Sequence, residues 1–413
     1  MPKKNIAIIG AGASGLMSAI LLAQQNLSVT LFEQNTRVGK KILASGNGHC
    51  NITNQNITHE DFFGTDTTFV EATLNNLSFK KLEKFAATIG ILFQSKDDGR
   101  TYPLSNEAKS VVLAFETMAL NLGVNIICDT KITSVNYLNN IFTLEDESNQ
   151  YKNFDTLIMA SGSNAAPQLG GSDTGYKICE TFGHSIIETF PSLVQLHLQN
   201  SLHAKMSGVR HDAQVTLHID KKKELSITGD VLFTAYGISG LAILDISHQA
   251  SLALLYKQNV EIEVNFFNTL PFQQFCSLIT KLLSNLPQHT INTALAGIIP
   301  LKMIEPLLDE IKIDKNSLSK NINTKQIKNI ASQMQRWRFS VSDTHGFKHA
   351  EVSGGGVTTY EVNPQTMESL LVKNLYITGE LLDIVGKRGG YNFHFAFATA
   401  FSSSQAIINT PIT

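Results

Sequence analysis

The sequence predicts an α/β protein with a parallel sheet that is interrupted by an inserted antiparallel β domain and a helical subdomain. Two observations predict the sheet: a strand, glycine turn, helix and strand lie within residues 5–33, and a strand, glycine-rich loop and helix lie within residues 374–408. A third predicts the insertion, because after residue 191 the pattern changes to short runs of alternating polar and apolar residues.

The first element is the run NIAII at residues 5–9, which is followed by GAGASG, a helical pattern and a second strand, SVTLFE, at residues 28–33. Strand, helix and strand within about 30 residues form a βαβ unit, which implies parallel strands and a right-handed crossover. Further elements of this domain are expected at 68–89 and 107–122 (helices) and at 124–128, 141–145 and 155–162 (strands).

The middle of the chain has a different character. Residues 192–248 alternate as antiparallel strands do, and residues 271–330 carry apolar positions three and four apart, as amphipathic helices do. The C-terminal strand and helix resemble the N-terminal unit, so the middle is expected to be an insertion. The predicted domains are 1–190 with 346–413, 191–270 with 331–345, and 271–330.

Composition narrows the range of partners. The 33 basic and 35 acidic residues give a net charge of −2, which favours neither nucleic acid nor an anionic membrane. The four cysteines form no C-x-x-C pair and no zinc spacing, which indicates a reducing cytoplasm and no metal site. An apolar N-terminal run imitates a signal peptide, but glycines interrupt it. We expect a cytoplasmic protein with a small-molecule substrate and without nucleic acid or membrane partners; the oligomeric state stays open.

Gly10, Gly12 and Gly15 stand in G-x-G-x-x-G register between the first strand and helix. In this motif the first glycine permits a tight turn, the second lets a pyrophosphate approach the backbone, and the third allows close packing of helix and strand. Glu33 ends the second strand, where an acid accepts hydrogen bonds from a ribose diol. The strand, the helix and the acid together predict dinucleotide binding.

The C-terminal tail favours FAD over NAD, because FAD proteins often add a distant C-terminal segment near the flavin ring. Gly379 and Glu380 end a strand, where an acid can bind ribityl hydroxyls. Gly390 then leads into a helix whose first amides, near Tyr391 and Asn392, can stabilise negative charge on the flavin. The alternative is an ordinary helix start with capping glycines.

Longer stretches make the sequence resemble the HI0933-like family of bacterial flavoproteins, which includes BaiN-like and aminoacetone oxidase-like members. The resemblance covers essentially the whole chain, and it is carried by stretches such as GAGASGL, KKILASGNGHCNITN, LIMASGSNAAPQLGGSDTGY and GGYNFHFAFATA. It implies non-covalent FAD in a three-domain protein, with a glutathione-reductase-like FAD-binding domain that carries the β and helical insertions.

The resemblance also implies individual roles. It places the pyrophosphate at Gly10, Gly12, Ser14 and Gly15. Glu33 would bind the adenosine ribose, the backbone of Ile132 the adenine, and Glu380 the ribityl chain. The turn Ala160, Ser161 and Gly162 would pass beneath the cofactor, and Gly390, Tyr391 and Asn392 would face the flavin ring.

The segment KKILASGNGHCNITN at residues 40–54 appears too irregular for a helix, and it is expected to cross the cofactor. The small residues Ser45, Gly46 and Gly48 leave room for the cofactor. Lys40 or Lys41 can neutralise pyrophosphate charge. The side-chain amides of Asn51 and Asn54 can form hydrogen bonds with the flavin ring or the backbone. For each lysine the alternative is a solvated surface charge. His49 stands where the family most often has arginine, and Cys50 is expected to be packed and not nucleophilic.

Four residues are candidates for catalysis. Arg100 could pair with a substrate anion or form a structural salt bridge, and Tyr236 could border the substrate pocket from the inserted domain. Tyr391 and His394 open the last helix; His394 is either a structural histidine or a proton carrier near the flavin.

The sequence contains no second dinucleotide motif in strand and helix context. Hydride is therefore expected from a substrate over the flavin, or from NADPH or NADH that visits the same pocket between the domains. The resemblance implies two chemistries, reduction of an enone with NAD(P)H and oxidation of an amine by oxygen. A third class is a structural, sensing or RNA-modification accessory role for a bound FAD.

Overall fold

The computed structural model of the chain describes residues 4–199 and 201–410. The chain forms two compact units, one up to Phe190 and again from Glu351 on, the other from Pro191 to Ala350. We call them the sheet unit and the barrel unit. Among the described residues, no helix has the length and apolar character needed to cross a membrane.

The sheet unit is built on five parallel strands in the order β20, β11, β1, β2, β7. Their bounds are Leu375–Ile377, Thr156–Met159, Asn5–Ile9, Ser28–Phe32 and Asn125–Ile127. Every residue of β11 is buried, as expected for a parallel strand that is covered on both faces. The predicted α/β class with its Rossmann sheet is confirmed.

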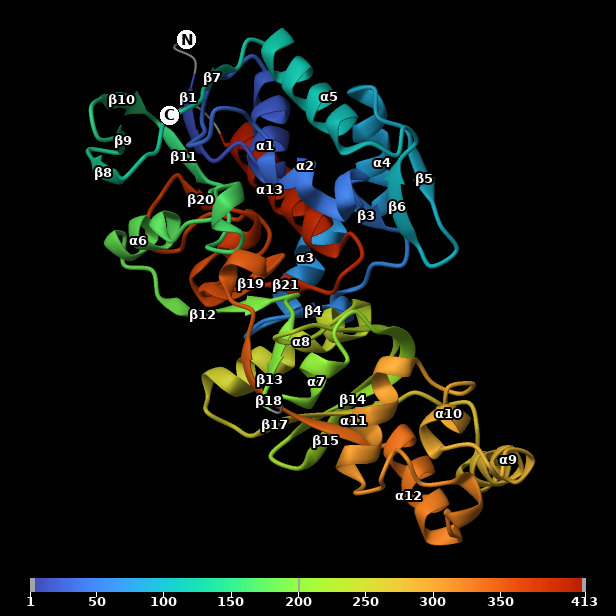
Figure 1. Cartoon of the computed structure of the whole chain (residues 1–413). Coiled ribbons are helices and arrows are strands. Elements are labelled where there is room, and N and C mark those ends of the chain that lie inside the picture. Colours follow the sequence, from blue (N-terminus) through green and yellow to red (C-terminus); the bar gives the residue numbers. More distant parts are fainter. Residues whose placement is uncertain (1–3, 200, 411–413) are drawn as a thin grey trace. The chain divides into compact units, whose positions relative to one another are not determined.

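Helices α1 (Ala13–Ala23) and α13 (Tyr391–Asn409) lie side by side against this sheet, so the two ends of the sequence meet (Figure 1). Helix α1 is buried at all but one of its positions, and α13 buries polar residues such as His394 and Ser403 beside its apolar ones. Five further helices belong to the unit: α2 (Lys40–Ala44), α3 (Thr68–Asn76), α4 (Phe79–Thr88), α5 (Ala108–Asn121) and α6 (Thr174–Thr181).

Two expectations about these helices were wrong. The helix predicted over 68–89 is two helices, because Ser78 adopts an extended conformation and begins α4. The segment expected to be irregular starts with the helix α2, followed by a short 3-10 turn over Ser45–Gly48 in which Gly46 and Asn47 take left-handed angles. The glycines and the asparagine explain why the helix stops after five residues.

Small sheets complete the sheet unit. They are β8 (Ser134–Leu138), β9 (Ile141–Glu145) and β10 (Gln150–Phe154); β3 (Thr53–Asn54), β5 (Phe93–Ser95) and β6 (Arg100–Pro103); β4 (Phe62–Phe63) with β21 (Val385–Gly386); and β12 (Ile186–Ser192), whose last two residues fall in the other unit, with β19 (Val352–Val357).

The barrel unit contains a closed barrel of six strands in the order β13, β16, β15, β14, β17, β18. Their bounds are Leu196–Leu198, Gly237–Ser239, Lys222–Phe233, Arg210–Ile219, Val260–Asn265 and Trp337–Thr344. The barrel closes through short pairings, since β15 pairs with β16 only at Leu232 and Phe233. The helices are α7 (Leu202–Lys205), α8 (Leu241–Leu255), α9 (Phe272–Asn285), α10 (Ile291–Leu295), α11 (Leu301–Glu310) and α12 (Thr324–Gln335).

One hydrophobic core joins the barrel to its helices. Trp337 and Phe339 of β18 lie in the same buried cluster as Phe275 of α9 and Met334 of α12. The helices α9 to α12 gather at one end of the barrel (Figure 1). The β and helical insertions are therefore parts of one unit with a shared core.

His394 fastens the first turn of α13 inside the sheet unit. Its Nδ1 lies 2.7 Å from the Thr53 hydroxyl and its Nε2 lies 2.9 Å from the Leu77 carbonyl oxygen. A carbonyl only accepts, so Nε2 carries the proton and Nδ1 accepts from Thr53. The ring is fully buried, and this burial lowers its pKa to about 4. The fold therefore holds His394 in the neutral form.

The lowered pKa of His394 predicts that the protein loses stability in mild acid. The unfolded ring binds its proton near its ordinary pKa of 6.5 and the folded ring only near 4, so stability falls as the pH drops through this window. From about pH 7.5 to about pH 5 the contribution is about 2 kcal/mol. Urea unfolding at both values measures it. His394→Gln removes the titration, so an equal pH dependence in variant and wild type would contradict the assignment.

Candidate cofactor and substrate site

The glycine turn between β1 and α1 is packed too tightly for any side chain at two positions. A Cβ at Gly10 would lie 2.4 Å from the carbonyl oxygen of Ala160, and a Cβ at Gly15 would lie 1.9 Å from the carbonyl oxygen of Gly10. Gly10 also has a φ of +104°. The turn after β11 is thereby pressed against the turn after β1, and the start of α1 is fixed above both.

Gly12 differs from Gly10 and Gly15, because a Cβ at Gly12 would meet no atom within 4 Å. Gly12 is the N-cap of α1 and offers no side chain that could cap the first amides of the helix. A helix N-terminus with room in front of it fits a pyrophosphate. Ser14, which was predicted beside the phosphates, donates its hydroxyl hydrogen bond to Thr378 at 2.8 Å.

Glu33 lies just after β2 with only 7% of its surface exposed. One carboxylate oxygen accepts the Ala11 amide at 2.9 Å, and the other accepts both the backbone and side-chain nitrogens of Asn35 at 2.8 and 2.6 Å. Glu33 thus stabilises the glycine turn through its hydrogen bond with the Ala11 amide. A carboxylate accepts about four hydrogen bonds, so capacity remains for a ribose hydroxyl.

The segment that precedes β8 runs beside this acid. The Thr130 amide donates to the Glu33 carbonyl oxygen at 2.9 Å, and the Asp129 amide donates to the Asn35 carbonyl oxygen at 3.0 Å. Ile132 follows; it is buried and lies just ahead of β8. The residue predicted for adenine contact is therefore on the same side of the sheet unit as the residue predicted for ribose contact.

The turn Ala160, Ser161 and Gly162 follows β11. Its Ala160 amide donates to the Ile9 carbonyl oxygen at 2.9 Å, which joins it to the end of β1. Gly162 has a φ of +73° and open space where a Cβ would lie. The buried Ser161 hydroxyl has no hydrogen-bond partner within the described structure and lies against Gly175 of α6.

Glu380 joins three segments through its carboxylate. One oxygen lies 2.6 Å from the Lys41 ammonium, and the other accepts the Ser163 hydroxyl at 2.6 Å and the Ser353 amide at 3.2 Å. The side chains of Lys41 and Glu380 are 33% and 18% exposed, so the pair is partly shielded from water. Sequence reasoning missed Ser163 and Ser353, since neither stands in a recognisable motif.

Lys40 points to a different part of the unit from Lys41. Its ammonium donates to the Asn35 side-chain oxygen at 3.0 Å, and Asn35 in turn bonds Glu33. Lys40 is thus linked through Asn35 to Glu33, the acid predicted to bind the ribose. Lys41 instead pairs with Glu380, the acid predicted to bind the ribityl chain. Asn35 is a further residue that the sequence reading missed.

The rest of the segment at residues 40–54 is held mainly by hydrogen bonds to backbone carbonyl groups. Ser45 donates its hydroxyl to the Ile42 carbonyl oxygen at 2.7 Å, and Gly46 and Gly48 have φ values of +55° and +87°. With its nitrogen toward them, the Asn51 amide donates to the carbonyl oxygens of Thr53 and Thr101 at 3.0 and 3.1 Å. These contacts are structural, whatever else the segment touches.

His49 and Cys50 behave differently although they are adjacent. His49 is exposed, and its Nδ1 lies 2.9 Å from the Asn106 carbonyl oxygen. Cys50 is 2% exposed, and burial raises the pKa of its thiol to about 12, so it is not a thiolate at neutral pH.

The start of α13 is a second close approach. A Cβ at Gly390 would lie 2.4 Å from the Thr53 carbonyl oxygen, and Gly379 has a φ of +67°. Asn392, predicted to face the flavin, bonds both the amide and the carbonyl oxygen of Gly386 at 2.8 Å. Its side chain fixes the loop ahead of the helix. Tyr391 is half-buried, with its ring edge-on to Phe62.

Arg100 and Tyr391 both lie against Gly389, whose Cβ would be 3.7 and 3.3 Å from their side chains, and His394 lies on the same turn of α13 as Tyr391. Arg100 forms an ion pair with Asp98 at 2.6 Å, and the hydrogen bond to Asp98 raises the pKa of Arg100. The neutral, fully enclosed His394 has both ring nitrogens engaged, which argues against proton transfer. Tyr236 belongs to the barrel unit, where its ring stacks on His345 at 3.9 Å.

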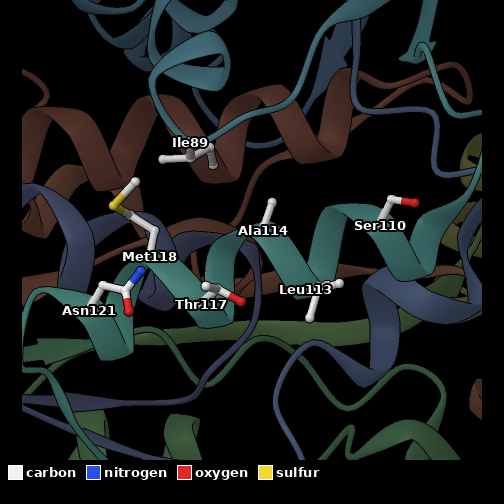
Figure 2. A pocket seen from close by; sticks show the side chains of 7 residues that line it. All are labelled: Ile89, Ser110, Leu113, Ala114, Thr117, Met118 and Asn121. Carbon is white, nitrogen blue, oxygen red and sulfur yellow. The ribbon is translucent and has the colours of Figure 1, made fainter.

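A hollow of about 270 Å³ lies along α5, and no predicted site residue lines it (Figure 2). Its lining residues are Ile89, Ser110, Leu113, Ala114, Thr117, Met118 and Asn121. These side chains offer no titratable group, so the hollow is not the centre of the chemistry. The residues of the glycine turn, Glu33, Glu380 and the start of α13 form the better candidate site.

Comparisons with known proteins agree with this frame. The 3-dehydro-bile acid delta(4,6)-reductase of Clostridium scindens is 33% identical over 409 residues, which cover 98% of this chain and 100% of that protein. A ribosomal RNA dihydrouridine synthase of Haemophilus influenzae is 31% identical, with 97% of each chain covered. The crystal structure of 3-ketosteroid delta1-dehydrogenase from Sterolibacterium denitrificans, 10% identical, matches 99% of this chain and 100% of its own with a TM-score of 0.52, which shows a shared fold.

The family comparison is equally extensive. The model of the HI0933-like protein Rossmann domain matches residues 4–406. Together with the full-length relatives, this match confirms the resemblance in the sequence. The chain belongs to the HI0933-like family, and it is a flavin-dependent oxidoreductase.

Proposed function

We propose that the protein is an FAD-dependent reductase that saturates a carbon–carbon double bond conjugated to a carbonyl group. The observation that carries this proposal is the agreement of two full-length relatives. One is named for reducing double bonds of a 3-dehydro bile acid, the other for making dihydrouridine, which is uridine with its ring double bond reduced. Both substrates place the double bond next to a carbonyl, so a shared chemistry explains both names.

The sheet unit supplies the residues that would hold FAD. The amides that begin α1 at Gly12 would meet the pyrophosphate, Glu33 the adenosine ribose, and Glu380 the ribityl chain, with Lys41 beside it. The first turn of α13 would face the ring with its amides. Bound FAD supplies hydride transfer, which no amino-acid side chain provides.

The electron donor in this proposal is NADPH or NADH, which enters and leaves the substrate site. Support comes from the sequence, where the G-x-G-x-x-G motif with its strand and helix occurs once. A second, permanently bound dinucleotide would need another such unit.

Reduction of a conjugated double bond also needs a proton for the carbon next to the carbonyl. Of the predicted residues we favour Tyr391 as the donor. It is the first residue of α13, and it is half-buried. Its ring packs edge-on against Phe62.

A second candidate function is the reduction of uridine in ribosomal RNA, which the name of the H. influenzae relative suggests. The reaction at the flavin would be the same, and the difference would lie in how the substrate is held. The expectation of no nucleic-acid partner came from the charge of the whole chain, which conceals a difference between its parts that is described below.

Gly12→Ala tests the cofactor assignment. The added methyl group meets no protein atom, so folding should be unchanged, but it occupies the space assigned to the pyrophosphate. FAD affinity, measured from quenching of flavin fluorescence, should fall by about tenfold or more. Gly297→Ala is the matched control, since its Cβ also meets nothing within 4 Å and it lies in the barrel unit. Equal affinities of both variants would contradict the assignment.

Anaerobic stopped-flow mixing tests the reaction class. NADPH or NADH should bleach the flavin of the FAD-loaded protein, and 4-androstene-3,17-dione or 2-cyclohexenone should restore its colour. Aminoacetone should leave the oxidised flavin unchanged. Bleaching by aminoacetone but not by either nicotinamide would replace the reductase with an amine oxidase, and bleaching by none of them would favour a structural or sensing flavin.

Tyr391→Phe tests the proton donor. The ring and its packing against Phe62 remain, while the hydroxyl group is lost. Flavin reoxidation by the enone should slow by about 100-fold, which is typical for loss of a general acid, and flavin reduction by NADPH should keep its rate. Tyr236→Phe is the comparison. If only Tyr236→Phe slows reoxidation, the donor belongs to the barrel unit.

A further inference from the structure

The two units carry opposite charge. Residues 191–350 contain 16 lysines and arginines and 12 acidic residues, whereas the rest of the chain contains 17 basic and 23 acidic residues. The net charge of −2 therefore combines a barrel unit of +4 with a sheet unit of −6. A balanced whole-chain charge does not exclude a polyanionic partner for one part.

The positive charge is concentrated around α12. From Lys315 to Ser342 the sequence has six basic residues and no aspartate or glutamate. Lys325 and Lys328 of α12 and Arg336, which follows it directly, are exposed, and so are Asn329 and Ser332. These five positions share one face of the helix, and we call them the α12 basic face. The opposite face carries the buried Ile327, Ile330, Ala331 and Met334.

The cations of this face are not neutralised by the protein itself. Of the flanking cations, Lys315 pairs with Glu305 and Arg338 pairs with Glu263, whereas Lys320 donates to the side-chain oxygen of Gln288. Across residues 201–350, by contrast, Lys325, Lys328 and Arg336 enter no ion pair. Helix α12 itself contains no carboxylate that could pair with them.

The chemistry of the face fits a sugar–phosphate backbone. From Lys325 to Arg336 the helix advances about 16 Å, enough for several phosphates. The amide of Asn329 and the hydroxyl of Ser332 lie between the cations, and such groups bond phosphate and sugar oxygens. The face has no exposed aromatic or aliphatic side chain, whereas a membrane-binding helix needs an apolar face and protein interfaces are enriched in aromatic anchors.

We propose that the α12 basic face is a docking surface for RNA, which it binds through backbone phosphates and without reading sequence. Its role in turnover rests on the reductase function proposed above, with a uridine of the bound RNA as the conjugated substrate. Binding itself does not depend on that function. The two can therefore fail separately.

The test measures binding of a fluorescein-labelled oligouridine of about 20 nucleotides to the full-length, FAD-loaded protein by fluorescence anisotropy. The triple variant Lys325→Gln, Lys328→Gln and Arg336→Gln should weaken binding about 100-fold near 0.1 M salt. It should also reduce the slope of log affinity against log salt by about 2, because three phosphate contacts are lost.

A matched control removes three charges elsewhere in the barrel unit, at Lys221, Lys222 and Lys223, which are all exposed. This variant, also to glutamine, should bind within about threefold of wild type. Equal losses in both triple variants would overturn the assignment to α12, as would salt-insensitive binding or no binding by wild type. Displacement by polyglutamate as effective as displacement by unlabelled RNA would indicate an acidic protein partner instead.

The rate at which the α12 triple variant reduces 2-cyclohexenone distinguishes a failure of the RNA-docking proposal from a failure of the proposed reductase function. Rates equal to wild type with lost RNA binding support the docking surface as a part distinct from the reaction centre. If wild type reduces the enone and binds no RNA, the docking surface fails and the reductase stands.

Discussion

The fold of the sheet unit depends on one close contact, the meeting of the turn after β1 with the turn after β11. Backbone atoms approach so closely at Gly10 and Gly15 that no side chain fits either position. This contact sets the start of α1, and Glu33 holds the same turn from behind through the Ala11 amide. The open space at Gly12 lies beside the start of this helix, where a phosphate can approach uncapped amides.

A second set of contacts brings distant segments to this turn. Glu380 joins Lys41, Ser163 and Ser353, and Gly390 lies against Thr53. The N-terminal and C-terminal parts of the chain therefore form one unit around the place where a cofactor fits. Many of the predicted cofactor residues also have protein partners, so the site is held in shape before anything binds.

Much of this arrangement could be predicted because its causes are local. The glycine spacing, the acid after β2 and the change of pattern after Pro191 are written in short stretches of sequence. The rest depends on residues far apart. The role of His394 depends on Thr53 and Leu77, and the partners of Glu380 come from three segments, so no local signal announces them. The helix α2 was missed because glycines close behind it concealed its five residues. Likewise, the net charge of the whole chain does not reveal that the two units carry net charges of opposite sign.

In the proposed function, reduced flavin passes its electrons to a conjugated double bond. A single turnover tests it directly: the FAD-loaded protein is photoreduced without oxygen and mixed with one equivalent of an enone, and flavin absorbance and product are followed together. The account predicts that oxidised flavin and the saturated ketone appear at the same rate and in equal amounts. Flavin that stays reduced with the enone, yet reoxidises at once in oxygen without product, would contradict it.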